Sequence, residues 1–193
     1  QLTEAETALQ ESVQLLSTLR QGLADADKVN VFDTQIYTYN LLMQVQVAQG
    51  DYEAALETSE QGRARAFVES VAGADTPLPP TTLTQMRQVA RTLDATLVEY
   101  AIVPEDDFTV QGRQRGTAGQ IFVWVVSPAG AVTFETLDLA GLDLSLAEQI
   151  QQSRRALGAF GRTRGLGVQA TTAPVPDTSL SDLYQLLIAP ISA

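Results

Sequence analysis

The sequence predicts an α+β fold, in which helical hairpins precede a small antiparallel three-stranded meander with flanking helices. Two observations lead to this class. Apolar residues recur every three to four positions through most of residues 2–73, as they do along helices. Over residues 95–137 the pattern changes to short apolar or alternating runs, which are typical of strands.

Three helices are expected in the N-terminal part. The first covers residues 3–20, and a turn or loop over residues 22–30 follows it. Asp33-Thr34 can cap the second helix, Gly50-Asp51 ends it, and Gly73 is expected to end a third helix that starts near Tyr52. The predicted apolar faces are Ala5, Leu9, Val13 and Leu16, widened by Leu2, Leu15 and Leu19, on the first helix, and Tyr37, Leu41, Leu42, Val45 and Ala48 on the second.

A proline-rich linker over residues 74–82 precedes a short helix and three strands. The strands are expected near residues 95–103, 120–126 and 131–137, with a polar insertion over residues 104–119. The middle strand is almost continuously apolar, so both of its faces should be covered. Ser127-Pro128-Ala129-Gly130 suits a turn between the last two strands. The apolar side of the short helix is predicted at Leu83, Met86, Val89, Ala90 and Leu93.

Two more helices are predicted after the strands. Ser145-Leu146-Ala147-Glu148 is a capping box, and the helix that it opens carries Leu146, Ile150 and Leu157. Residues 159–177 lack periodicity and should form a loop. A last, strongly apolar helix starts near Ser179. This helix and the lack of an initiator Met lead us to expect part of a longer protein.

The composition excludes several classes of function. The chain has no Cys and no His, so it offers neither a thiol nor an imidazole for catalysis and no thiolate zinc site. We predict no catalytic residue, no cofactor and no metal site. The net charge of −11 disfavours nucleic-acid binding, which depends on Lys and Arg. No apolar run approaches the roughly 20 residues that span a bilayer, so we expect a cytoplasmic protein without a membrane partner.

Three features of the sequence resemble ligand sites in part. The Gly- and Arg-rich residues 158–167 lack the Gly-x-x-x-x-Gly-Lys-Ser/Thr order of a phosphate-binding loop. Glu105-Asp106-Asp107 are adjacent, so they cannot all turn toward one cation. We interpret both segments as solvated loops. Trp124 lies within an apolar strand, which favours a place in the core over a stacking platform.

The second helix and the start of the third resemble a tetratricopeptide (TPR) repeat. Gly50, Tyr52 and Ala55 match the Gly-x-Tyr-x-x-Ala centre of that motif, in which Gly turns the chain, Tyr packs across the turn and Ala lets the helices approach. Leu42 also fits, whereas Tyr39 stands in place of Trp and Met43 in place of a small residue. The resemblance implies that these helices bind a protein or peptide partner.

A second resemblance rests on the order of several short runs. They are Gly62-Arg63-Ala64-Arg65-Ala66-Phe67, Leu97-Val98-Glu99-Tyr100, Phe122-Val123-Trp124-Val125-Val126 and Leu186-Leu187-Ile188-Ala189-Pro190-Ile191. Together they resemble TPR-linked CHAT proteins, a caspase-like and separase-like peptidase family common in bacteria. That family uses a His and a Cys in the segment after the last run. The resemblance therefore implies a non-catalytic N-terminal part that is inactive alone, with the catalytic CHAT segment as its partner in cis or in trans.

Three parts are predicted on this basis. They are TPR-like repeats in residues 1–73, a linker and short helix in residues 74–92, and the non-catalytic part of a CHAT-like domain in residues 93–193. Arg63, Arg65 and Phe67 are candidates for partner binding or for contacts between domains. On a helix, Arg63 and Arg65 project about 200° apart, so they cannot both face one partner. A structural role, through acidic or carbonyl partners, is the alternative.

The predicted function is to position substrate or to regulate a CHAT-type cysteine peptidase. The alternative is a stand-alone TPR-type interaction scaffold with an accessory β-domain. The last helix separates the two hypotheses. If the chain is part of a peptidase, its apolar residues should pack on the catalytic half and stay partly bare here, whereas a complete module should bury them. The candidates for this packing are Leu183, Tyr184, Leu187 and Ile188.

Overall fold

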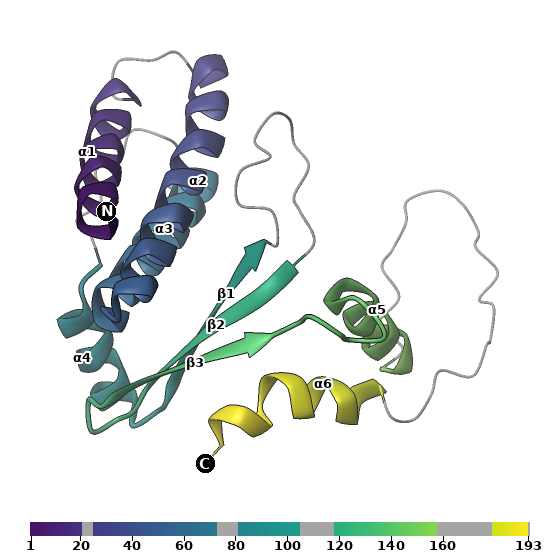
Figure 1. Cartoon of the computed structure of the whole chain (residues 1–193). Helices are drawn as coiled ribbons and strands as arrows, with labels where there is room; N and C mark the ends of the chain where they lie inside the picture. The colour runs from purple at the N-terminus through teal and green to yellow at the C-terminus, as the bar shows by residue number, and fades with distance from the viewer. Residues whose placement is uncertain (21–24, 73–80, 105–117, 158–178, 193) are drawn as a thin grey trace. The chain divides into compact units, whose positions relative to one another are not determined.

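The computed structural model describes residues 1–20, 25–72, 81–104, 118–157 and 179–192, with the backbone alone for residues 20, 25–35, 64–72 and 179. Within them, helices and a three-stranded antiparallel sheet form an α+β fold, as predicted (Figure 1). The helices are α1 (Leu2–Arg20), α2 (Asp25–Gln49), α3 (Tyr52–Ala72), α4 (Leu83–Leu93), α5 (Leu146–Ala156) and α6 (Ser179–Leu187). The strands are β1 (Leu97–Pro104), β2 (Ala118–Val126) and β3 (Val132–Asp138), and a short 3-10 turn covers Ala189–Ile191.

The chain divides into two compact units that do not follow the order of the sequence. One unit comprises residues 1–101 and 124–134, and the other comprises residues 102–123 and 135–193. Each strand therefore contributes residues to both units. The first unit contains α1 to α4, and the second contains α5 and α6.

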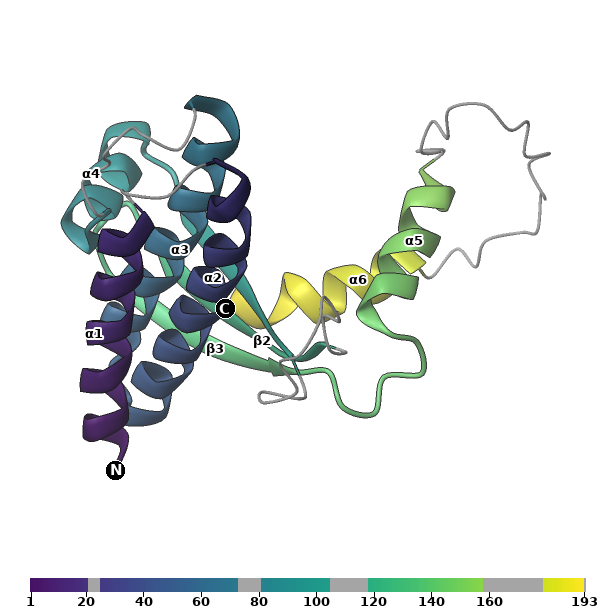
Figure 2. The same cartoon turned by 90° about the horizontal axis from the view of Figure 1, so that it is seen from above.

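In the first unit, α1, α2 and α3 lie side by side (Figures 1 and 2), and α2 contacts both neighbours. Gly50 takes a positive φ of 81° after α2, a conformation that suits a residue without a Cβ. The Gly50 N–H donates to Val47 O at 2.9 Å, and the Asp51 N–H donates to Gln46 O at 3.0 Å. The Asp51 carboxylate then accepts the Ala54 N–H at 3.1 Å and caps α3. The predicted turn at Gly50 and Asp51 is therefore confirmed.

The buried face of α2 differs from the prediction. The helix begins at Asp25, ahead of the predicted Asp33, because no Gly or Pro interrupts residues 25–49. Tyr39, Leu42 and Met43 are buried together with two polar residues, Thr38 and Gln46. Of the predicted positions, only Leu42 is buried. The reason is that α2 packs between two helices, and its buried stripe is set by both.

Three other helices bury fewer apolar residues than predicted. A helix buries only the stripe that faces its neighbours, and apolar residues outside it remain exposed. Large fractions of the following predicted positions are accessible: Leu2, Leu15 and Leu19 on α1, Val89 and Leu93 on α4, and Ile150 of α5 with Leu157 directly after it.

The sheet has the order β1-β2-β3, the predicted meander. The Gly130 N–H donates to Ser127 O at 2.8 Å, which confirms the predicted turn between β2 and β3. Four consecutive residues of β2, Ile121 to Trp124, are all buried. Because side chains alternate between the two faces of a strand, both faces of β2 are covered, as predicted.

Local hydrogen bonds fix the starts of α4 and α5. Ser145 and Glu148 form the predicted capping box. Thr82 and Gln85 form a second one at α4, which the prediction missed although the Thr-x-x-Gln signal is in the sequence. The α3 helix ends at Ala72, directly before Gly73. Residues 74–80 of the predicted linker, the acidic residues 105–107 and the Gly-rich residues 158–167 lie outside the described residues.

Candidate functional site

Within the first unit, α3 contacts each element that follows it in the sequence. Its side chains and first carbonyl group reach α4 and the parts of all three strands that belong to this unit. Both α3 and these elements are thereby held by polar groups in addition to apolar packing. The contacts join Glu53 to Arg87, Glu57 to Leu83, Ser59 and Arg63 to Glu99, and Tyr52 to Trp124 and Phe134.

The most buried charged group among these contacts is Glu99 of β1, which is 8% exposed. The Ser59 hydroxyl donates to its Oε1 at 2.6 Å. Arg63 Nη2 lies 2.8 Å from its Oε2 and also pairs with Glu60, one turn earlier on α3. Each oxygen of the buried carboxylate therefore has its own donor from α3, which is how a charge can be kept in a protein interior.

The environment of Glu99 changes its acidity. Burial raises the pKa of Glu99 to about 7, and the hydrogen bond from Ser59 and the charge of Arg63 offset only part of this rise. The nearby Glu60 carboxylate acts in the same direction as burial. A carboxyl with a pKa near 7 changes its charge within the physiological range, and the ion pair with Arg63 is then complete only at higher pH.

Three aromatic residues join the start of α3 to the sheet. The Tyr52 and Phe134 rings are stacked, with centroids 4.3 Å apart and planes inclined by 11°. Trp124 is fully buried, as predicted for a core residue, and its indole N–H donates to Tyr52 O at 2.8 Å. The TPR motif predicts that Tyr52 packs across the helical turn. In the structure its ring stacks on Phe134 of β3, a contact that the motif does not include.

Arg87 of α4 contacts both α3 and the turn between β2 and β3. Its Nε donates to Gly130 O at 2.9 Å, and its Nη2 lies 2.7 Å from Glu53 Oε1. Gly130 has a positive φ of 89°, and a Cβ built on it would lie 3.1 Å from Arg91 Nη2. Glycine thus lets the hairpin turn approach the two arginines of α4.

Gly62 begins the Gly62–Phe67 run and lies where α3 meets α2. A Cβ at this position would lie 3.1 Å from Tyr39 Cβ and 3.3 Å from Tyr39 Cγ. Tyr39 is only 6% exposed, so it has little room to move. Gly62 therefore permits the close approach of the two helices, in the way that small residues do at tight helix contacts.

The predicted site residues fall in different parts of the structure. Arg63 contacts Glu60 and Glu99, and 55% of its side chain is exposed. The side chains of Arg65 and Phe67 lie outside the described residues. On α6, Leu183 and Leu187 are half-buried and Tyr184 is exposed, and Ile188, directly after the helix, is also exposed. The roles of all of these in partner binding stay predictions.

Ser59 and Glu99 are not among the predicted site residues. A signal for Glu99 was present, because it is a charged residue at an inward position of an otherwise apolar strand. Such a residue is either paired or protonated. No comparable signal marks Ser59, which becomes relevant only because it lies 40 positions before Glu99 in the chain and next to it in space.

Comparison with known proteins bears on the helical hairpins. The chain is similar to tetratricopeptide repeat protein 28. The human protein is 28% identical over 142 residues and the mouse protein 25% identical over 139 residues, which correspond to 69% and 68% of this chain. The chain spans only about 5% of the length of either relative. No protein-family model and no solved structure matches the chain.

This similarity makes the chain TPR-like, and it is not confined to the helices of the first unit. Since α4 ends at residue 93, a match to 69% of the 193 residues must include part of the region that holds the sheet. In the described part of the chain, no three His, Cys, Asp or Glu residues are grouped as a cation would require. None of the described helices has both the length and the apolar character needed to cross a membrane.

Proposed function

We propose that this chain is a protein-binding scaffold whose TPR-like helices α1 to α3 take a segment of a partner protein. The observation that carries the proposal is the similarity to two TPR proteins, together with the tightly packed hairpin of α2 and α3. Helical repeats of this kind present extended surfaces to their partners and leave their own packing unchanged.

The outer face of α1 is the part of this surface best suited to contact. Leu15 and Leu19 lie one helical turn apart and are 64% and 61% exposed. Neighbouring exposed apolar side chains commonly mark a protein interaction surface. Polar groups on the opposite side of α1, such as Glu6, are already bonded to Gln46 and Gln49 of α2 and are not free for a partner.

Peptide selection tests the proposal. Random peptides displayed on phage are selected for binding to the full chain. Hydrogen exchange of the chain then shows where the selected peptides bind. We expect protection on α1 to α3, and about tenfold weaker binding to a Leu15→Ala, Leu19→Ala variant. Leu157→Ala is the matched control, because Leu157 is equally exposed but lies outside the first unit. Failure to select any binder, or equal losses in variant and control, would contradict the proposal.

A finer proposal assigns this scaffold to a TPR-linked CHAT peptidase, as its non-catalytic, substrate-positioning or regulatory portion. The resemblance of the short sequence runs to that family supports this finer proposal. Leu183, Leu187 and Ile188 are not buried in the described structure, which is the condition expected of a surface that packs on a catalytic segment. The stand-alone scaffold remains the alternative.

Both forms predict that the chain alone shows no peptidase activity, because it contains neither Cys nor His. One measurement distinguishes the two forms. The source DNA beyond the Ala193 codon should encode one His and one Cys within roughly a further domain's length. A stop codon at that point, with no partner that carries these residues, would overturn the finer proposal and leave the stand-alone scaffold.

A further inference from the structure

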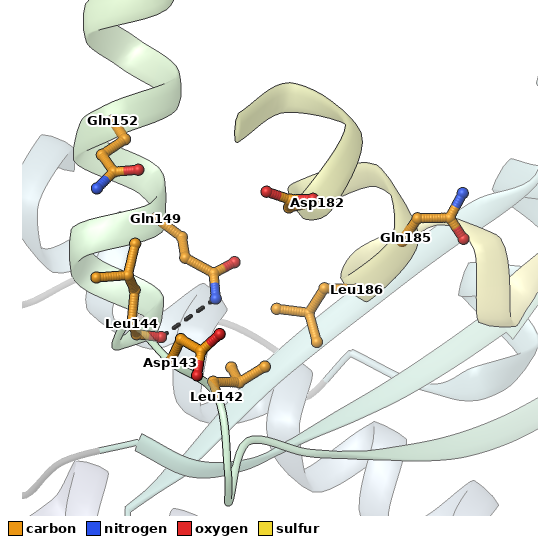
Figure 3. Close-up of a pocket in the computed structure, with 8 residues that line it drawn as sticks. All are labelled: Leu142, Asp143, Leu144, Gln149, Gln152, Asp182, Gln185 and Leu186. Atoms are coloured by element: carbon orange, nitrogen blue, oxygen red, sulfur yellow. Dashed lines mark hydrogen bonds between the residues drawn. The ribbon is translucent and has the colours of Figure 1, made fainter. Parts of the chain in front are cut away.

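A cavity of about 530 Å³ lies between α5 and α6 in the second unit (Figure 3). Its size falls within the range of about 300–1,000 Å³ that is typical of ligand sites. The close-up shows Gln149 of α5 and both Asp182 and Leu186 of α6 directed into the space between the two helices. Neither TPR-like helices nor any predicted site residue lines this cavity.

The orientation of α5 is the first indication that the cavity is a site. Ile150 is 39% exposed and Leu157, directly after the helix, is 67% exposed, whereas Gln149 and Gln152 line the cavity. Leu146 at the start of α5 is buried, so apolar packing orients that end of the helix, whereas further along it Gln149 and Gln152 line the cavity and Ile150 does not. Polar side chains that line a cavity can hydrogen-bond to a ligand in it.

The hydrogen-bonding groups of the lining provide the second indication. In the described part of the chain, no hydrogen bond or ion pair engages the side chains of Asp143, Gln152, Asp182 or Gln185. Gln149 Nε2 donates to Leu144 O at 3.2 Å, which holds the amide in place at the cavity. Carboxylates and amides without protein partners can receive the donors of an incoming molecule.

We propose that this cavity binds an extended segment of a partner protein in which basic and apolar residues alternate. Among the described residues of the lining, only Asp143 and Asp182 are charged, so a Lys or Arg side chain complements them. The amides can pair with the peptide main chain, and Leu142, Leu144 and Leu186 can contact its apolar side chains. The net charge of −11 attracts such a segment over a longer range.

Fluorescence anisotropy on the full chain tests this proposal. The probe is a fluorescein-labelled peptide of sequence Leu-Arg-Leu-Arg-Leu, and its counterpart has Glu in place of both Arg residues. We expect the basic peptide to bind and its counterpart not to bind. Asp182→Asn should weaken binding about tenfold. Glu135→Gln should change it less than about twofold, because Glu135 is exposed on β3 and does not line the cavity.

Nuclear magnetic resonance then locates the bound peptide without relying on any variant. Backbone signals of residues 142–152 and 182–186 should shift on addition of the probe. Equal weakening by Asp182→Asn and Glu135→Gln, or shifts confined to α1 to α3, would overturn the proposal. None of the described lining residues belongs to α1, α2 or α3. The Leu15→Ala, Leu19→Ala variant should therefore bind this probe with unchanged affinity, so the two proposals can fail separately.

Discussion

At the scale of single residues, Glu99 shows how a local change of environment becomes a property of the whole protein. Its folded pKa of about 7 lies above its ordinary value of 4.5. The folded state therefore keeps a proton that the unfolded state releases near pH 4.5. The resulting contribution to stability is fully present below pH 4.5 and is lost as the pH rises through 7.

A Glu99→Gln variant isolates this effect. Glutamine has nearly the shape of glutamate but does not titrate. The contributions of all other titratable groups to the pH dependence therefore cancel when the two proteins are compared. We expect the free energy of unfolding of the native chain to fall, relative to the variant, by on the order of 3 kcal/mol between pH 4.5 and pH 8. Urea titrations at several pH values measure it. Glu135→Gln is the control, and a difference that grows in the opposite direction would show that Glu99 is stabilised as an anion.

Gly62 gives a second prediction at this scale. In a Gly62→Ala variant, better helix propensity favours α3 by about 1 kcal/mol. Overpacking against buried Tyr39 costs about 1–3 kcal/mol, because the new Cβ would lie 3.1 Å from Tyr39 Cβ. We therefore expect the free energy of unfolding to fall by about 1 kcal/mol, measured by urea denaturation. An increase would mean that α2 and α3 can separate at little cost.

Gly50 offers a useful comparison with Gly62. A Cβ at Gly50 would meet no atom within 4 Å, but its φ of 81° is unfavourable for an ordinary L-residue. Gly50→Ala should thus destabilise through the backbone alone, and Gly50→Asn should destabilise less, because Asn tolerates this conformation. The two glycines serve different purposes even though the sequence shows the same residue at each.

At the scale of elements, a polar network aligns the first three helices. The Thr58 hydroxyl of α3 donates to Gln46 Oε1 of α2 at 2.7 Å, and Gln46 Nε2 donates to Glu6 Oε1 of α1 at 3.3 Å. Gln46 and Thr58 are 4% and 6% exposed. Since a buried polar group without a partner is costly, the network favours one register of the three helices over others.

A double-mutant cycle measures this network. Thr58→Val leaves Gln46 Oε1 buried without a donor, and we expect a loss of about 1–3 kcal/mol in the free energy of unfolding. Replacing both partners, with Gln46→Leu and Thr58→Val, should cost less than the sum of the single changes. Urea denaturation of the four proteins gives the coupling energy. Strict additivity would show that the two side chains do not depend on each other.

The elements themselves were largely predictable, and so were the buried residues Leu83, Met86 and Ala90 of α4, whereas the buried face of α2 was not. The turn at Gly50-Asp51 and the cap at Ser145 depend on residues within a few positions, so the local sequence specifies them. The buried stripe of α2 depends on α1 and α3, which lie elsewhere in the sequence. The side chains that α5 directs toward α6 also depend on a segment elsewhere in the sequence: its glutamines line a cavity, whereas Ile150 is exposed.

At the scale of the whole molecule, the excess of acidic residues is the dominant electrostatic feature. The net charge of −11 and the isoelectric point near 4.3 imply mutual repulsion within the folded chain at neutral pH. Ordered ion pairs such as Arg87 with Glu53 offset a small part of it. Charge of this size favours solubility and costs some stability of the compact state.

Salt should therefore stabilise the protein. Raising the sodium chloride concentration from about 20 mM to about 300 mM shortens the screening length several-fold and weakens the repulsion among carboxylates. We expect Tm at pH 7.5 to rise by about 2–4 °C for each kcal/mol of repulsion removed, measured by circular dichroism. Potassium chloride should act equally. A lower Tm in salt would mean that attractive ion pairs outweigh the net repulsion.

The fold class, the order of the elements, the turns and the lack of Cys and His follow from the sequence alone, because each depends on composition or on neighbouring residues. The contact of Ser59 with Glu99 across 40 positions and the bond from Trp124 to Tyr52 across 72 appear only once the chain is folded. The buried face of α2 likewise depends on the folded structure. Such contacts depend on how distant segments pack together, and periodicity along one segment contains no information about the segment that will cover it.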